Sequence, residues 1–173
     1  MAEGLLRTHL AHAGVPAAVG SAGLLPGGSS ATRHAVEVMA ERGIDISGHH
    51  SRMLDSALVR STPLIIGMTR HHVREAVVTY GAAIERTFTL KELVRRGEKV
   101  GARGRSEPVS VWLARVAKGR VVSDMVVDDP DDDVADPIGR PRYEYEATAA
   151  ELDDLLARFV TLLVGIGNVA APG

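Results

Sequence analysis

A short apolar run at residues 64–68 (Leu-Ile-Ile-Gly-Met), bounded by Pro63 and Thr69, constrains the fold more than any other feature. It shows no polar alternation, which is typical of a strand buried on both faces, as parallel sheets require. Residues with helical periodicity follow it, starting at Thr69 and including Val73 and Val77. Because strands alternate with helices, the sequence predicts an α/β fold in which helices flank a parallel sheet.

Apolar spacing and end signals predict the remaining elements. Thr89 and Glu92 form a Thr-x-x-Glu capping box, which begins a helix that Gly97 is expected to end. The first helix has no residue ahead of it to cap its free amides. The other predicted helices cover residues 1–13, 31–42, 108–118 and 143–164, and the other predicted strands cover 15–22 and 84–88.

The length of 173 residues predicts one domain over residues 1–173. A net charge of −2 offers no general attraction to nucleic acid or to an anionic membrane. No stretch approaches the roughly 18 apolar residues of a membrane span, so we expect a cytoplasmic protein.

Basic residues 95–105 include no aromatic side chain for base stacking, which favours a mobile, solvated surface loop.

The chain contains no cysteine, which excludes disulfides, thiolate metal sites and cysteine nucleophiles among these residues. The adjacent pairs His49-His50 and His71-His72 do not share a helix face and lack zinc-site spacing. The aspartate-rich residues 128–133 lack the mid-loop glycine and closing glutamate of an EF-hand. We therefore predict no metal site.

Nucleotide binding and serine hydrolase chemistry are also disfavoured. The glycine-rich residues 23–30 and 165–167 carry neither a P-loop nor a dinucleotide fingerprint, and no Gly-x-Ser-x-Gly elbow occurs. The segment from Asp136-Pro137 to Arg140 is more informative, because proline restricts the aspartate backbone and Gly139 permits a sharp turn. Such a loop can hold one carboxyl group over a pocket.

Several short strings, in this order and spacing over about residues 1–165, resemble the low-molecular-weight protein tyrosine phosphatase family. Relative to shorter family members, residues 95–119 resemble an insertion. The strings are residues 1–6 (Met-Ala-Glu-Gly-Leu-Leu), 21–23 (Ser-Ala-Gly), 35–36 (Ala-Val), 42–47 (Arg-Gly-Ile-Asp-Ile-Ser), 49–52 (His-His-Ser-Arg), 68–70 (Met-Thr-Arg) and Asp136-Pro137.

The resemblance implies a reaction that needs no metal or other cofactor. In the family, a Cys-x5-Arg loop followed by Ser-Pro precedes the helix that here begins at Met1, and its thiolate attacks the phosphoryl group. This sequence contains none of that loop and hence no nucleophile. Asp136 matches the family's general acid. Ser21 matches a serine that supports the phosphate loop, and His49 and Arg52 match a supporting region.

The resemblance also implies that the family's central first strand, between the strands matching residues 15–22 and 64–68, is absent from this sequence. Both neighbours would lose a partner, so we expect the chain as given to be unstable or to rearrange. One interpretation is a longer protein that includes the loop and hydrolyses phosphotyrosine in proteins. The alternative is a catalytically inactive phosphatase-like binding protein. An arsenate reductase would need redox cysteines that the sequence lacks.

Overall fold

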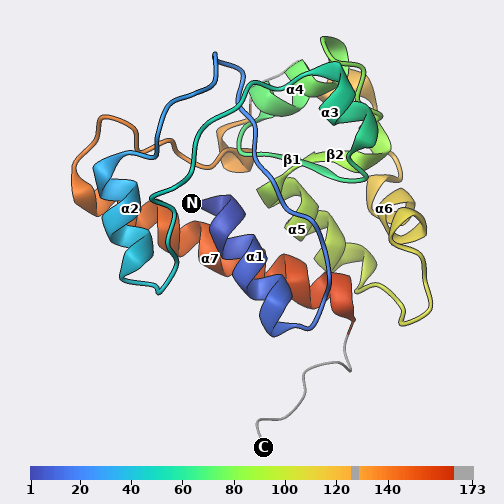
Figure 1. Ribbon diagram of the computed structural model, residues 1–173. Coiled ribbons are helices and arrows are strands. Elements are labelled where there is room, and N and C mark those ends of the chain that lie inside the picture. Colours follow the sequence, from blue (N-terminus) through green and yellow to red (C-terminus); the bar gives the residue numbers. More distant parts are fainter. Residues whose placement is uncertain (126–128, 166–173) are drawn as a thin grey trace, which may run out of the picture. The chain divides into compact units, whose positions relative to one another are not determined.

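The computed structural model describes residues 1–125 and 129–165 (Figure 1). The chain divides into two compact units. Unit 1 comprises residues 1–54 and 134–157, and unit 2 comprises residues 55–133 and 158–173. The last helix, α7 (Arg142–Val164), begins in unit 1 and ends in unit 2.

Unit 1 is built on helices α1 (Ala2–His12) and α2 (Arg33–Ala40) and the first part of α7. Thr32 begins α2, and its hydroxyl accepts a hydrogen bond from the Ala35 amide, as a helix cap should. Two residues of α2 and two of α7 form the buried core, against which the side chains of Met1 and Ile46 pack. The four core residues are Ala35, Val38, Tyr145 and Ala149.

Helix α1 is anchored to α7 within unit 1, as Figure 1 shows. Leu5 and Leu10 are buried, which confirms the apolar face expected from their spacing. His9 Nε2 lies 2.7 Å from Asp153 Oδ1, so a polar contact joins the two helices as well. The predicted helix over residues 1–13 is therefore confirmed.

The predicted strand at residues 15–22 does not form, so this prediction is wrong. The backbone of these residues joins no β-ladder in the described part of the chain, and the N–H groups of residues 17–20 donate to no described acceptor. Two arginine side chains bind carbonyls of the segment instead: Arg7 Nη2 donates to Val19 O (2.7 Å) and Arg52 Nε to Ser21 O (2.8 Å). An extended stretch without a neighbouring strand cannot satisfy its own backbone groups.

Unit 2 contains the parallel sheet, formed among the described residues by β1 (Ile65–Gly67) and β2 (Thr87–Thr89). Ile66 pairs with Phe88 at the centre of the register. Strand β1 falls within its predicted range, whereas β2 overlaps the predicted 84–88 strand only at residues 87–88 and extends to Thr89. The 3₁₀ turn η1 (Ile84–Arg86) takes the first part of that predicted strand. Helix α4 (Arg70–Val78) lies on one side of the strands and α5 (Leu90–Val100) on the other (Figure 1).

Threonine side chains begin both helices that follow the strands. Thr69 accepts from the His72 amide and Thr89 from the Glu92 amide, so both predicted helix starts are confirmed. The short helix α3 (Ser56–Ser61), capped by Asp55, has no counterpart among the predicted elements.

Helix α5 continues past Gly97 and ends at Val100, contrary to the predicted end. The chain reverses at Gly101, whose φ of +85° suits glycine. Gly97 is buried, and a Cβ there would lie 2.8 Å from Leu162 Cδ1. Residues 95–100 are thus helical and not part of a surface loop.

Helix α6 (Val109–Ala117) packs its single tryptophan into the core of unit 2. Trp112 is fully buried, its indole N–H donates to Gly101 O (3.0 Å), and its ring lies 6.5 Å from that of Phe159. The predicted helix at residues 108–118 is confirmed, and it is a core element of this unit.

A second core element of unit 2 is the guanidinium of Arg120, whose side chain is only 2% exposed. It donates to Glu92 (2.8 Å) and to the Thr87 carbonyl (2.8 Å), and lies 4.2 Å from the centre of the Phe88 ring. Burial lowers the pKa of Arg120, and the Glu92 carboxylate opposes that shift. This buried cation joins β2 to the first turn of α5.

The aspartate-rich segment also folds onto unit 2. It includes the 3₁₀ turn η3 (Pro130–Asp132), and another 3₁₀ turn, η2 (Val122–Met125), precedes it in the chain. The Asp132 carboxylate is fully buried and accepts hydrogen bonds from Arg70 (2.8 Å) and Arg95. Asp133 Oδ1 accepts from the Arg70 amide (2.7 Å), which satisfies a free donor of the first turn of α4.

These arginines neutralise the buried charge of Asp132. Burial by itself raises the pKa of Asp132, but the hydrogen bonds from Arg95 and Arg70 outweigh burial and lower that pKa below its usual value. The aspartates here hold arginines of the same unit, which gives this acidic stretch a structural role.

No helix in the described part of the chain is both long enough and apolar enough to cross a bilayer.

The replacement Asp132→Asn should destabilise unit 2 by about 3 kcal/mol, because it leaves two arginines without their buried partner. Urea unfolding followed by the fluorescence of Trp112 measures this loss. Asp131→Asn, at an exposed neighbour, is the matched control and should change stability by less than about 0.5 kcal/mol.

The stabilisation from Asp132 should also depend on pH. Since its pKa is lowered in the folded protein, the contribution is complete above the usual value of 3.8 and is lost as pH falls toward the folded-state pKa. Asp132→Asn should remove this part of the acid sensitivity. An unchanged pH dependence in the variant would contradict the assignment.

Candidate functional site

The start of α1 presents free backbone donors. Met1 is the N-cap and supplies no side-chain hydrogen bond, and the first bond of the helix runs from the Leu5 amide to Met1 O (3.1 Å). The amides of residues 2–4 therefore have no acceptor within the helix. Burial lowers the pKa of the Met1 amine, while the nearby Glu3 opposes that shift. The amide groups and the helix dipole make this end of α1 suited to negative charge.

The negative group found there is the Glu3 carboxylate, which gathers three side chains around it. Ser21 Oγ donates to Glu3 Oε2 (2.5 Å), and Arg7 Nη2 lies 2.5 Å from Glu3 Oε1. His49 Nδ1 lies 4.0 Å from Glu3 Oε2. Glu3 is only 15% exposed at its side chain, so the carboxylate is enclosed by its partners.

Arg52 holds the segment that carries Ser21. Its Nε donates to Ser21 O, and its own carbonyl accepts from the Gly23 amide (2.9 Å). Gly20 permits this approach, because a Cβ there would lie 2.6 Å from Arg52 Nη2. Ser21, Arg52 and His49, three of the four predicted site residues, thus lie in one polar cluster centred on Glu3.

The fourth predicted residue, Asp136, lies in a separate turn of unit 1. Its side chain is exposed, and its Oδ1 accepts a hydrogen bond from the Ile138 amide (3.0 Å). The turn therefore holds Oδ1 against its own backbone and leaves the carboxyl group exposed. Among the described residues, Asp136 forms no hydrogen bond or ion pair with Ser21, His49 or Arg52.

Sequence reasoning did not select Glu3 as a site residue. The sequence did contain a signal for Glu3, because an acidic residue in the first turn of a helix interacts favourably with the helix dipole. What the sequence did not reveal is that Ser21, Arg7 and His49 converge on it. The described residues include no cluster of three or more potential metal-binding side chains.

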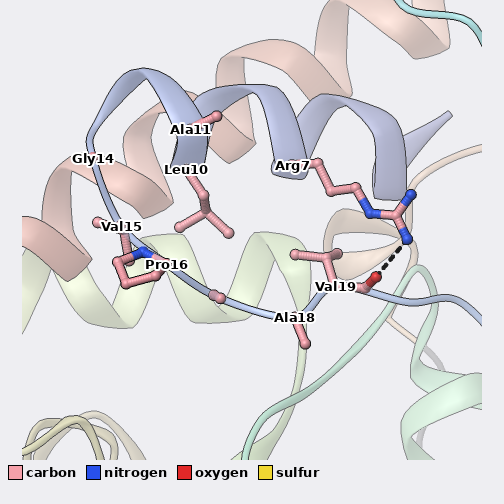
Figure 2. Close-up of a pocket in the computed structure, with 9 residues that line it drawn as sticks. Arg7, Leu10, Ala11, Gly14, Val15, Pro16, Ala18 and Val19 are labelled. Carbon is pink, nitrogen blue, oxygen red and sulfur yellow. Dashed lines mark hydrogen bonds between the residues drawn. The ribbon is translucent and has the colours of Figure 1, made fainter.

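A shallow groove runs between α1 and residues 14–19, which follow it in the chain (Figure 2). Its walls are mostly apolar, with Leu10 and Ala11 contributed by the helix. Arg7 lies at one end, where it binds the Val19 carbonyl. Since Arg7 is the only charged side chain in this lining, the groove offers no acid, base or nucleophile for chemistry.

Comparison with known proteins decides the family. Residues 1–103 match the family model described as low molecular weight phosphotyrosine protein phosphatase. The chain belongs to this family. The matched region contains the Glu3 cluster with Ser21, His49 and Arg52, whereas the Asp136 turn lies beyond it.

A curated relative of this phosphatase-family chain is a protein-arginine-phosphatase of Geobacillus stearothermophilus. The two are 28% identical over 136 residues, which cover 79% of this chain and 69% of the relative.

Solved structures of the phosphatase family share the fold. A low molecular weight protein tyrosine phosphatase from T. tengcongensis is 29% identical with a TM-score of 0.67, covering 94% of this chain and 88% of that one. The YwlE arginine phosphatase of Geobacillus stearothermophilus is 27% identical with a TM-score of 0.64, covering 92% and 80% of the two chains. The predicted α/β fold class is confirmed.

Replacement of Gly27 by alanine tests the backbone that supports this region. A Cβ at Gly27 would lie 2.7 Å from Ser51 O and 2.9 Å from Arg52 Cα, so backbone atoms would have to move. We expect a local destabilisation of about 2 kcal/mol and at least roughly tenfold faster hydrogen exchange at the Gly23 and Gly28 amides. Both amides donate to carbonyls of the backbone at residues 51–52, which would be displaced.

Gly48→Ala is the matched control, because no heavy atom lies within 4 Å of the Cβ it would add. Equal exchange rates in the two variants would show that the close approach at Gly27 does not support this backbone.

Proposed function

We propose that this chain forms the scaffold of a phosphatase that hydrolyses phosphotyrosine in proteins through a cysteinyl-phosphate intermediate. The family match over residues 1–103 is the observation that carries the proposal. None of the 173 residues is cysteine, so the reaction requires a Cys-x5-Arg loop from outside this sequence. The free amides at the start of α1 support the proposal, because such a helix end binds phosphate and lowers a thiol pKa.

The proposed reaction has two displacements at phosphorus. The loop thiolate forms the S–P bond while the P–O bond to the tyrosine oxygen breaks, and protonated Asp136 gives its proton to that oxygen. The Asp136 carboxylate then takes a proton from water, whose oxygen attacks phosphorus. The S–P bond breaks, and inorganic phosphate and the thiolate are released.

The geometry of the Asp136 turn supports this role. The carboxyl group is exposed, and its Oδ1 is oriented by the Ile138 amide. In the described part of the chain no hydrogen bond engages Oδ2, which leaves that oxygen to exchange a proton with the leaving group or water.

We assign a supporting role to the cluster around Glu3. None of Ser21, His49 and Arg52 carries a thiol, and the hydrogen bonds of Ser21 and Arg52 are directed within unit 1. In this proposal they orient the backbone beside the start of α1, where the phosphate loop would join. Their effect on catalysis is therefore through the position of that loop.

Phosphoarginine in proteins is the second candidate substrate. The curated relative is a protein-arginine-phosphatase, and the aliphatic Ile138 follows Asp136-Pro137 in this chain. An aliphatic side chain gives a phenyl ring no aromatic stacking partner.

The alternative function is a catalytically inactive, phosphatase-like binding protein. The observation in its favour is the absence of cysteine from the sequence. The organisation of residues 1–173 as one domain, the insertion at residues 95–119 and the cytoplasmic location stay predictions.

A chimera tests the proposal. The strand and Cys-x5-Arg loop of the T. tengcongensis relative are joined to Met1, and hydrolysis of p-nitrophenyl phosphate and of phosphotyrosine and phosphoarginine peptides is measured. We expect turnover by the chimera and none by the 173-residue chain or by the chimera with its cysteine replaced by serine. A folded chimera without activity would refute the proposal and favour the binding protein.

Within an active chimera, Asp136→Asn should lower turnover of phenyl phosphate by about 10²–10⁴-fold, because phenolate is a poor leaving group that needs a proton. The loss should be much smaller for p-nitrophenyl phosphate. Asp45→Asn, at an exposed aspartate of the same unit, serves as the control. Equal losses for both substrates would remove Asp136 from the role of general acid.

A further inference from the structure

The turn that carries Asp136 exposes a second charged side chain, that of Arg140. The Arg140 amide donates to Pro137 O (2.9 Å), and Gly139 takes a φ of +73°, so the two ends of the turn lie close together. Pro137 is buried, whereas Ile138 is 66% exposed and Arg140 is exposed. A carboxyl group, an aliphatic side chain and a guanidinium thus project from one short turn of fixed conformation.

Arg140 differs from every other arginine of unit 1 in lacking a partner. In the described part of the chain its guanidinium forms no hydrogen bond and no ion pair. The other five arginines of this unit each bind a carboxylate or a carbonyl: Arg7 to Glu3, Arg33 to Glu37, Arg42 to Val38 O, Arg52 to Ser21 O and Arg142 to Glu41.

The proposed function, on which this inference rests, places this turn beside the polypeptide of the substrate. A general acid must come within about 2.6–3.2 Å of the leaving atom, and that atom belongs to the side chain of the phosphorylated protein. Residues that project from the same turn therefore face the amino acids that flank the phosphorylated residue, and not the phosphoryl group itself.

We propose that Arg140 is a specificity-determining residue that binds an aspartate or glutamate close to the phosphorylated residue of the substrate. A planar guanidinium pairs with a carboxylate through two parallel hydrogen bonds. Because Arg140 has no competing carboxylate partner within the described residues, it has no existing ion pair to break. Since this ion pair between Arg140 and the substrate is exposed to solvent, it contributes modestly to substrate binding, and added salt weakens it.

The test uses two phosphopeptides that differ only in their flanking residues, glutamate in one and glutamine in the other. In the active chimera, kcat/KM for the glutamate peptide should exceed that for the glutamine peptide by about three- to fivefold at low salt. Arg140→Ala should abolish this preference mainly by raising KM for the glutamate peptide. Arg140→Glu should reverse it, since two carboxylates then repel each other.

Arg33→Ala is the matched control, because Arg33 is an exposed arginine of the same unit. It should retain the preference for the glutamate peptide. If Arg140→Ala also retains it, or if it slows both peptides equally, the inference about Arg140 is overturned while the proposed function stands.

If the proposed function is wrong, the result is different: the chimera folds but does not hydrolyse p-nitrophenyl phosphate. The same two peptides are then titrated against the chimera by fluorescence anisotropy. Tighter binding of the glutamate peptide that depends on Arg140 would support the recognition, and equal binding of both peptides would overturn it.

Discussion

A buried extended backbone persists in a folded protein only where its amide and carbonyl groups find partners, and the two units differ in how they meet this constraint. In unit 2, β1 and β2 satisfy each other as parallel strands. In unit 1, residues 15–22 have no strand beside them among the described residues, and they remain extended without a ladder. Arg7 and Arg52 each bind one carbonyl of that segment, which compensates for a small part of the pairing.

The same two arginines connect this constraint to the candidate site. Arg7 also binds Glu3, and Arg52 holds the carbonyl of Ser21, whose hydroxyl donates to Glu3. The backbone of the extended segment and the polar cluster at the start of α1 therefore form one network. A change at any of these side chains would alter both the course of the segment and the surroundings of the free amides of α1.

In unit 2, buried charged side chains are enclosed by partners of opposite charge. Asp132 is enclosed by Arg70 and Arg95, and Arg120 is enclosed by Glu92 and the ring of Phe88. Removing one member of such a pair is more damaging than the pair is stabilising, because the remaining charge loses its solvation as well as its partner. Within the acidic run, Asp132 thereby neutralises arginines of the same unit.

This chain contains only some of the groups that the family's reaction needs. It contains the start of α1 with its unbonded amides and the exposed carboxyl group of Asp136. It contains no thiol. In the proposed function, phosphate binding and proton transfer are assigned to these residues, whereas covalent catalysis requires a thiol that none of the 173 residues carries.

Local sequence patterns were enough to predict most helices, strand β1, the fold class and the family resemblance. The starts of α4 and α5 were predictable because Thr69 and Thr89 bind amides only three residues away, and the apolar run at residues 64–68 identified β1. Tertiary structure alone decided that Glu3 collects Ser21 and Arg7, that Gly97 lies inside a helix, and that residues 15–22 form no strand. These outcomes depend on which distant groups meet, and since any free arginine, serine or strand edge could have provided a partner, no local pattern specifies the choice.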